Sequence, residues 1–402
     1  MQKTPKRGIL IISENAENGK LRKFLNKTAY LIACVLLAAS LSACSVQKTF
    51  RFQDDAASTL VDFTMIGTDA GQVEKAHEEC LFAVSDVITS LSSDNDSLAR
   101  FNAPEGEITE GEYNILGERE KYISARVNRR VYDATLKAKR LYALTDGKFN
   151  ACSFGLYSLW RGSTVPGDDL IAIETLGVSN PLLIGEKVSG GEYYLTKIVY
   201  PEKDGSIVKP HTRLSFERMS SGYALDCAVE KARRYGLTGI SITTRFVAVF
   251  DGKGNRSDGK WNYSARLEDG RELMEVVVPG GYAIATLDVA YGSGTIGDLF
   301  VGGVIDCKSG IPATIIKTED GSYRNKSDYV VYAAVVAKYA ADAQALCDYA
   351  LATYEQKQRT EKLKENALCS IVVTRQGKIY VTGDAQYSHS DLLGDDYQTV
   401  KL

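Results

Sequence analysis

The chain has few of the side chains that build metal clusters or disulfide frameworks. Among its 402 residues are three histidines and eight cysteines, and the cysteines stand singly, with no C-x-x-C pair. A zinc site or a disulfide framework needs paired or closely spaced ligands, so neither is supported. The cysteines of the folded part are therefore expected to be mostly buried free thiols.

An excess of positive charge is also missing. The formal net charge is −3, and the first segment is itself basic, so the remainder is more acidic than the whole chain. A nucleic-acid surface needs basic residues gathered on one face, and no nucleic-acid partner is expected. A phosphate ligand stays possible, because it needs only local positive charge or a metal.

Long apolar runs are lacking as well. The run from Ala29 to Ala39 follows basic residues and is too short to cross a hydrocarbon core of about 30 Å. It ends in Leu41-Ser42-Ala43-Cys44, an order typical of a lipoprotein signal peptide whose cleavage leaves a lipidated Cys44. An uncleaved membrane anchor is the alternative. We expect a lipid-anchored protein on the extracytoplasmic side of the cell membrane or outer membrane.

The remainder is long enough to bury a sizeable core and is most simply one large domain. We divide the chain into a signal peptide (1–43), a lipidated tether (44–50), a folded domain (51–390) and a C-terminal tail (391–402). Helices and strands are mixed without a regular βαβ period, which predicts an α+β fold of mixed sheets and helices.

Hydrophobic periodicity locates the main elements. The first two helical faces carry Val73, Ala76, Cys80, Ala83, Val87 and Leu91, and then Val127, Val131, Ala134, Ala138 and Leu141. A third helix is predicted from Tyr223 to Tyr235, and a fourth carries Ala337, Ala341, Leu346 and Leu351. Strands are predicted at 59–67, 193–200, 240–250, 274–278 and 282–286, with hairpin turns at 201–205 and between 371–374 and 378–381.

Residues Gly292 to Gly297 fit G-x-G-x-x-G and follow a predicted strand. A dinucleotide fingerprint requires a helix directly after the glycines, because amides at the helix N-terminus hold the pyrophosphate. Residues 298–305 instead look like another strand and turn. A glycine-rich hairpin loop is the preferred interpretation, and a Rossmann fingerprint is the alternative.

Several short motifs stand in one order between residues 59 and 381. They are 97–102 (SLARFN), 145–160 (TDGKFN to LW), 222–226 (GYALD), 283–286 (AIAT), 306–312 (DCKSGIP) and 341–343 (ADA). In this order they resemble the motifs of the ApbE-type flavin transferases. The resemblance implies an ApbE-like, T-fold-like α+β domain.

The resemblance also implies a reaction: Mg²⁺-dependent cleavage of FAD, transfer of FMN to a threonine of a partner flavoprotein, and release of AMP. Such a transfer needs the charge of two adjacent phosphates to be neutralised, which a hard cation with oxygen ligands can do. By resemblance, Asp342 is the metal ligand. The cofactor-binding residues carried over are Asp146, Gly222, Tyr223, Asp226, Thr286, Asp306, Ser309 and Gly310.

At several positions the chain departs from the family's pattern. The second metal ligand falls on Leu346, which has no oxygen to coordinate a cation. Ser221 stands in place of a lysine and Gly303 in place of a histidine. Arg218 and Arg245 replace glycines, and their positive charges could neutralise phosphate in place of a metal ion.

Each candidate site residue also has a structural interpretation. Asp342 could cap its helix or lie on a solvated face, and Asp226 could complement the dipole of its own helix. Tyr223 could be a core residue, and Asp146 and Asp306 could belong to ordinary turns. Three functions stay open: FMN transfer, binding of a flavin, nucleotide or partner protein by a non-catalytic relative, and a structural lipoprotein without a ligand.

Overall fold

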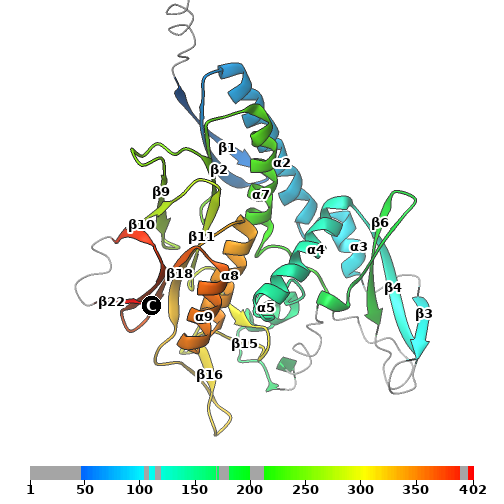
Figure 1. Cartoon of the computed structure of the whole chain (residues 1–402). Coiled ribbons are helices and arrows are strands. Elements are labelled where there is room, and N and C mark those ends of the chain that lie inside the picture. Colours follow the sequence, from blue (N-terminus) through cyan, green and yellow to red (C-terminus); the bar gives the residue numbers. More distant parts are fainter. Residues whose placement is uncertain are drawn as a thin grey trace, which may run out of the picture. The chain divides into compact units, whose positions relative to one another are not determined.

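A nine-stranded sheet forms the centre of the fold (Figure 1). Its strand order is β1 (Lys48–Ala56), β2 (Thr59–Gly67), β7 (Gly239–Thr243), β8 (Val247–Gly252), β11 (Tyr282–Asp288), β18 (Val330–Ala337), β19 (Cys369–Thr374), β20 (Lys378–Gly383) and β22 (Gln398–Lys401). From β2 to β20 each neighbouring pair is antiparallel, and β22 lies parallel to β20. The central strands are buried on both faces, which explains continuous apolar sequences such as VVYAAVVA in β18.

The computed structural model describes residues 47–103, 108–113, 119–168, 170–171, 181–199, 212–389 and 397–402. The predicted signal peptide, Cys44, the tip of the hairpin at 201–205 and the start of the C-terminal tail lie outside the described residues. Residues Thr49–Leu402 form one compact unit. In the described ranges, no helix combines the length and the apolar character needed to span a membrane.

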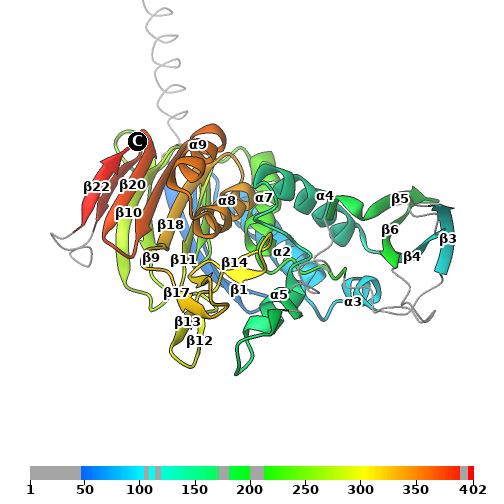
Figure 2. The same ribbon diagram turned by 90° about the horizontal axis from the view of Figure 1, so that it is seen from below.

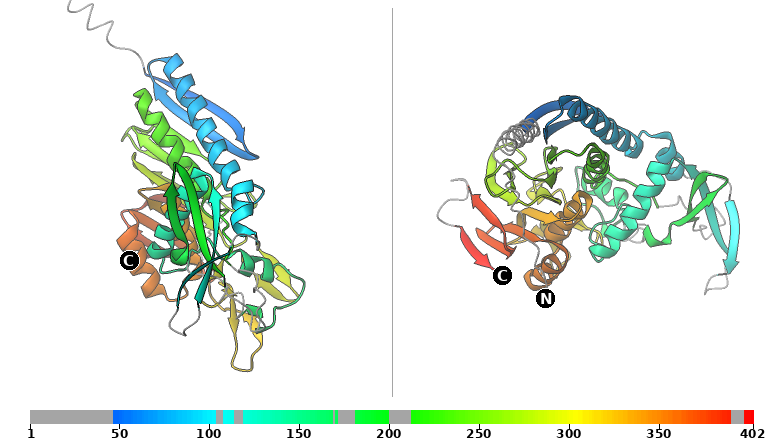
Figure 3. Two further views of the ribbon diagram at one scale, coloured as in Figure 1. Left: turned by 90° about the vertical axis from the view of Figure 1, so that its right-hand side faces the viewer. Right: turned by 45° about the horizontal axis from the view of Figure 1, so that its top comes forward.

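The two faces of the central sheet are covered differently (Figure 2). Helices α2 (Ala70–Leu91), α7 (Ser220–Ala232) and α8 (Ala340–Ala352) pack on one face, and Figure 3 shows α2 beside α7. A three-stranded sheet of β9 (Trp261–Arg266), β10 (Glu272–Val278) and β21 (Gln386–His389) covers part of the other face. Each layer encloses its own hydrophobic core.

Helix α8 is buried along its whole length, as expected of a helix that is apolar on all sides. Its only charged side chains are Asp342 and Asp348, and both are buried. A charge taken out of water needs a partner inside the protein. The two ends of α8 therefore carry two ionic groups, which are described below.

A second sheet lies beyond α4 from the central sheet (Figure 2). It consists of β3 (Ile108–Tyr113), β4 (Arg119–Val127), β6 (Glu192–Val199) and β5 (Gly185–Ser189), in this order, and packs on α3 (Asp96–Asn102) and α4 (Arg129–Leu144). Other helices of the described residues include α5 (Phe154–Trp160), η1 (Pro181–Leu183), η2 (Arg233–Tyr235) and α9 (Gln356–Asn366). Short hairpins are formed by β12 (Gly294–Ile296) with β13 (Leu299–Val301), β14 (Ile305–Asp306) with β15 (Ile311–Pro312), and β16 (Ile315–Lys317) with β17 (Tyr323–Asn325).

The predicted α+β class is confirmed, and so are most of the elements. Strand β2 has the predicted bounds, and the apolar face predicted for the first helix is the buried face of α2. Gly236, with φ at 62°, ends the third helix as a left-handed cap. The glycine-rich segment forms the β12–β13 hairpin, so the Rossmann alternative is wrong. The cysteines of the described residues are free thiols, and most are buried.

Several element bounds differ from the predictions, and three of the differences arise because tertiary contacts override local periodicity. Val127 is the last residue of β4 and Ala337 the last residue of β18, so both precede the helices to which they were assigned. The strand predicted at 240–250 is two antiparallel strands, β7 and β8, because Thr244 and Val247 close a turn between them. Apolar residues on both sides of a tight turn give the same pattern as one long strand.

Candidate functional site

A cavity of about 930 Å³ opens where segments from distant parts of the chain converge. It is lined by 58–60 and 62, 148–151, 153, 157 and 161, 215, 217, 218 and 221, 243–247, 262–264 and 266, 286, 287, 291, 292 and 303, and Gln344 and Asp348 of α8. Ligand pockets typically have volumes of about 300–1,000 Å³. The space is therefore large enough for a sizeable ligand.

Four of the positions at which the sequence departs from the family motifs line this cavity. Arg218 and Ser221 line it from near the start of α7, and Arg245 lines it from the turn between β7 and β8. Gly303, which stands where the resemblance implies a histidine, lines it as well. Leu346, the fifth such position, is buried in the core and does not line it. The bulky substitutions leave this cavity open.

Arg218 is held by a buried ion pair with Asp348. Its Nε lies 3.1 Å from Oδ2 of Asp348, and its Nη2 donates to Oδ1. Its Nη1 donates to the carbonyl oxygen of Gly303 at 3.0 Å, and the guanidinium lies 5.5 Å from the ring centre of Tyr157. Burial disfavours the charge, but the Asp348 carboxylate outweighs it and raises the pKa of Arg218. The donors of Arg218 are therefore engaged by Asp348 and Gly303 within the protein.

Gly303 has no room for any side chain. A Cβ atom at this position would lie 1.6 Å from the carbonyl oxygen of Tyr291. The amide of Gly303 donates to the carbonyl of Val289, which brings the two segments into this close contact. The loss of the histidine therefore comes with a backbone approach that only glycine permits.

Aromatic rings form part of the cavity wall. The rings of Phe246 and Tyr291 contact edge to face with centroids 5.0 Å apart, and Phe149, Tyr157 and Tyr263 also line the space. Such rings offer faces on which a planar ligand can stack. Tyr223, the aromatic residue predicted to contact a flavin, packs against the main core and is not among the lining residues.

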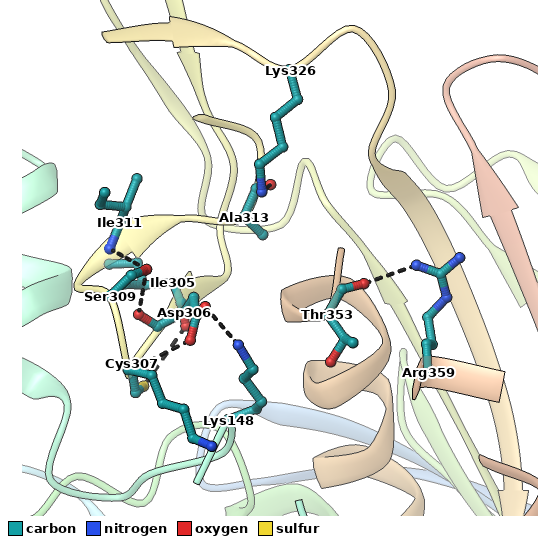
Figure 4. A network of polar contacts seen from close by, with 11 residues as sticks. Lys148, Ile305, Asp306, Cys307, Ser309, Ile311, Ala313, Lys326, Thr353 and Arg359 are labelled. Carbon is teal, nitrogen blue, oxygen red and sulfur yellow. Dashed lines mark hydrogen bonds and ion pairs between the residues drawn. The ribbon is translucent and has the colours of Figure 1, made fainter. Parts of the chain in front are cut away.

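Asp306 and Ser309 lie together in one turn (Figure 4), and a backbone hydrogen bond from Gly310 to Asp306 closes it. Oδ1 of Asp306 accepts from the amide of Lys308 at 3.0 Å, as in an Asx turn, and the backbone carbonyl of Asp306 accepts from the amide of Gly310 at 2.8 Å. Oδ2 of Asp306 lies 2.6 Å from Nζ of Lys148, a cavity-lining residue. The turn therefore reaches the cavity through Lys148.

Asp146 and Thr286 are placed differently. Asp146 has a left-handed backbone with φ at 50°, and its Oδ1 accepts from Nζ of Lys362 in α9 at 2.9 Å. Thr286 in β11 is the one predicted cofactor-binding residue that itself lines the cavity. Its amide donates to the carbonyl of Phe246 at 2.8 Å, which joins the aromatic wall to the central sheet.

Asp226 and Asp342 belong to an ionic group at the N-terminus of α8, which we call the Asp342 cluster. Its members are Asp226 of α7, Asp342 of α8, and Lys137 and Arg140 of α4. Arg140 donates to Oδ1 of Asp342, and Nζ of Lys137 lies 3.3 Å from the same oxygen and 3.9 Å from Oδ2 of Asp226. The two carboxylates are thus matched by two cations.

The carboxylate of Asp226 caps α8. Its Oδ1 accepts from the amide of Ala340 at 2.7 Å and its Oδ2 from the amide of Ala341 at 3.2 Å. These are amides of the first helical turn, which have no partner within their own helix. Asp226 thus complements the dipole of α8, whereas the sequence-based interpretation had assigned it to its own helix.

Gly222 permits the close approach of α7 to the N-terminus of α8. Its amide donates to Oε1 of Gln344 at 3.0 Å, and a Cβ atom at this position would lie 2.8 Å from backbone atoms of Ala340 and Ala341. Helices α7 and α8 therefore meet at Gly222 through their backbones.

Solved structures show the same architecture. The apo form of flavinyl transferase ApbE from Pseudomonas stutzeri has a TM-score of 0.59 at 16% identity, with 86% of this chain and 97% of that chain covered. The fold is that of the ApbE flavin transferases. The apbe protein of Thermotoga maritima has a TM-score of 0.59 at 16% identity over 87% of this chain and 100% of that chain.

A third structure agrees with these two. Flavin transferase ApbE from Vibrio cholerae has a TM-score of 0.55 at 17% identity over 86% of this chain and 98% of that chain. No protein-family model and no curated protein matches the sequence. At these identities the structural similarity shows the ApbE-like fold, and the activity requires a separate argument.

The ApbE-like fold implies a divalent cation, and the residues around Asp342 do not fit one. Mg²⁺ requires several oxygen ligands in an octahedral arrangement. Asp342 is instead engaged by Lys137 and Arg140, and Leu346 is fully buried in the core. Across the part of the chain that the structure describes, no group of three His, Cys, Asp or Glu side chains could hold a metal ion.

Several cavity residues were not selected from the sequence. Asp348, Gln344, Tyr291 and Arg161 match no motif, and their neighbours come from distant segments. One signal was available for Asp348, which is one of two charged residues in a largely apolar helix and therefore needed a buried partner. The ApbE-like scaffold thus carries a ligand-sized cavity, and several of its polar side chains belong to no motif found in the sequence.

Proposed function

We propose that this protein binds a flavin nucleotide, FAD, in the cavity described above. The observation that carries the proposal is that two of the segments matching ApbE motifs, 145–160 and 283–286, line one open cavity of about 930 Å³ together with positions that depart from the motifs. The cavity has aromatic faces for a planar ring system and cationic side chains for phosphate. These are the two chemical needs of a flavin nucleotide.

Quenching of FAD fluorescence by the full-length protein in detergent tests the proposal. Saturable quenching is expected, and Phe246→Ala should weaken the affinity about three- to tenfold, because an aromatic contact contributes about 0.5–1.5 kcal/mol beyond its buried area. Phe82→Ala on α2 is a suitable control, since Phe82 is 71% exposed and does not line the cavity. Absence of saturable quenching would remove the proposal.

Transfer of FMN from FAD to a threonine of a partner flavoprotein, with release of AMP, is the second candidate function. The ApbE-like fold favours it. The family's use of Mg²⁺ finds no matching ligand set at Asp342, so we derive no metal-dependent step for this chain. Incubation with FAD, Mg²⁺ and a threonine-bearing acceptor distinguishes the two functions. An enzyme yields AMP and a covalently fluorescent acceptor, whereas a binding protein yields neither.

A lipid anchor at Cys44 would place this activity at the extracytoplasmic membrane surface. Its support is the order of basic residues, apolar run and Leu41-Ser42-Ala43-Cys44 in the sequence. Metabolic labelling with a radioactive fatty acid should mark the protein, and Cys44→Ala should abolish the label. Persistent labelling of the Cys44→Ala variant would contradict the anchor.

A further inference from the structure

Five cationic side chains line the cavity, and most of them have carboxylate partners. They are Lys148, Arg161, Arg218, Arg245 and Arg266. Lys148 pairs with Asp306 at 2.6 Å, Arg218 with Asp348, and Nη1 of Arg245 lies 3.8 Å from the Glu268 carboxylate. Within the described ranges, Arg161 and Arg266 are left without a carboxylate partner, and Arg266 donates to the carbonyl of Gly270 at 3.1 Å.

Arg161 occupies a particular place. It directly follows α5 and lines both the main cavity and an adjoining pocket of about 160 Å³. Tyr157, Gly292 and Gly303 are also shared by the two spaces. Nη2 of Arg161 lies 3.9 Å from where a Cβ atom of Gly292 would stand, so the glycine leaves the guanidinium uncovered on that side.

The two carboxylates of α8 are already neutralised. Asp342 is paired with Lys137 and Arg140, and Asp348 with Arg218. Asp62 and Glu217 also line the cavity, but no group of three His, Cys, Asp or Glu side chains among the described residues could hold a metal ion. The positive charge that a bound diphosphate needs is therefore offered by the protein itself. A guanidinium suits this need, because its planar donors match two phosphate oxygens at once and it stays charged at every physiological pH.

We propose that Arg161 binds a phosphate group of the flavin nucleotide, and that this binding needs no divalent cation. The inference rests on the proposed function and specifies how that site recognises its ligand. It reassigns to Arg161 the phosphate role that the sequence suggested for Arg218 and Arg245, both of which have carboxylate neighbours.

The test compares riboflavin, FMN and FAD as ligands of the full-length protein, each with EDTA and with MgCl₂. We expect equal FAD affinity in both buffers. Arg161→Gln should weaken FMN and FAD binding about tenfold or more, because a hydrogen bond to a charged group contributes about 1.5–3 kcal/mol. Riboflavin has no phosphate, so its affinity should stay unchanged. Arg234→Gln, an exposed arginine that does not line the cavity, is the matched control.

The outcomes separate the inference from the proposed function. If none of the three flavins binds, the proposed function fails and the inference fails with it. If FAD binds only with MgCl₂, the metal-independent binding is overturned. If Arg161→Gln binds FAD like the wild type, or loses riboflavin equally, the phosphate contact is overturned. Should Arg161→Gln not fold, Arg161→Lys keeps the charge without the planar fork and should weaken FAD and FMN selectively.

Discussion

The two ionic groups of α8 differ in what surrounds them. At its N-terminus, the Asp342 cluster joins α4, α7 and α8, and neither of its carboxylates lines the cavity. Six residues after Asp342, Asp348 pairs with Arg218, and both of these side chains line the cavity. Asp226 and Asp342, which match family motifs, therefore stabilise the packing of helices. Arg218 and Asp348, which match no motif, shape the wall of the cavity.

The difference shows that residues matching a motif can serve the packing of helices. Asp226 and Gly222 match the sequence pattern, and their contacts hold α7 against the start of α8. Arg218 replaces a glycine of the family motif, and its charge is paired with the buried carboxylate of Asp348. A buried pair of this kind is costly to break, because removal of one partner leaves an uncompensated charge.

The largest effect is expected from breaking the Arg218–Asp348 pair. Asp348→Ala should lower the free energy of unfolding by about 3–5 kcal/mol, since Arg218 would stay buried without a counter-ion. The double variant Arg218→Met, Asp348→Leu should recover much of this loss. Urea unfolding of single and double variants measures the coupling. Asp269→Ala, which breaks an exposed pair with Arg271, is the control. Equal costs at both sites would contradict a buried pair.

The contact between α7 and α8 can be broken at Gly222. Gly222→Ala should lower the free energy of unfolding by about 1–3 kcal/mol, because the new methyl group would lie 2.8 Å from the backbone of Ala340 and Ala341. Thermal unfolding checks this result. Gly167→Ala, at a glycine without neighbours within 4 Å and without a left-handed φ, is the matched control. An unchanged melting temperature for Gly222→Ala would argue against the close approach.

The Asp342 cluster should make stability depend on pH. Burial raises the pKa of Asp226 from 3.8 to about 6, although Lys137 and the amides of Ala340 and Ala341 oppose the shift. Between these two values the folded protein binds more protons than the unfolded chain. The free energy of unfolding should therefore fall as pH rises from about 4 to about 6, by roughly 2 kcal/mol.

The Asp226→Asn variant isolates this effect, because it cannot ionise. Urea unfolding of wild type and variant across pH 4–7 gives the difference that belongs to Asp226. The wild type should lose stability relative to the variant as pH rises through this window. A parallel pH dependence of the two proteins would mean that Asp226 titrates as it does in the unfolded chain.

The smallest effect is expected at Arg245. Arg245 is exposed, Glu268 is half-buried, and their charged groups lie 3.8 Å apart, so Arg245→Ala should change the free energy of unfolding by less than about 1 kcal/mol. Arg218→Ala should cost far more, although the sequence suggested the same phosphate role for both arginines. Urea unfolding of the two variants side by side measures the contrast. If Arg245→Ala lowers the free energy of unfolding as much as Arg218→Ala does, the difference in burial between the two arginines does not explain their contributions.

Most of the fold was readable from local patterns. The spacing of Val73, Ala76 and Cys80 marks the buried face of α2, and Gly236 marks the end of α7 and η2. These signals act between residues a few positions apart, where helix and strand periods apply directly. The partners of Asp226 and Arg218 lie 114 and 130 residues away, respectively. No local pattern indicates which distant group will meet a side chain.

The sequence by itself determined the α+β class, the run of elements and the resemblance to ApbE proteins, because periodicity and motif order survive substitution of individual residues. The tertiary structure decided which motif residues line the cavity and which are structural. It placed the cap of α8 on Asp226, tied Asp342 to α4 and left Arg161 at the junction of two pockets. The physical reason is that burial and charge compensation depend on neighbours that only the folded chain brings together.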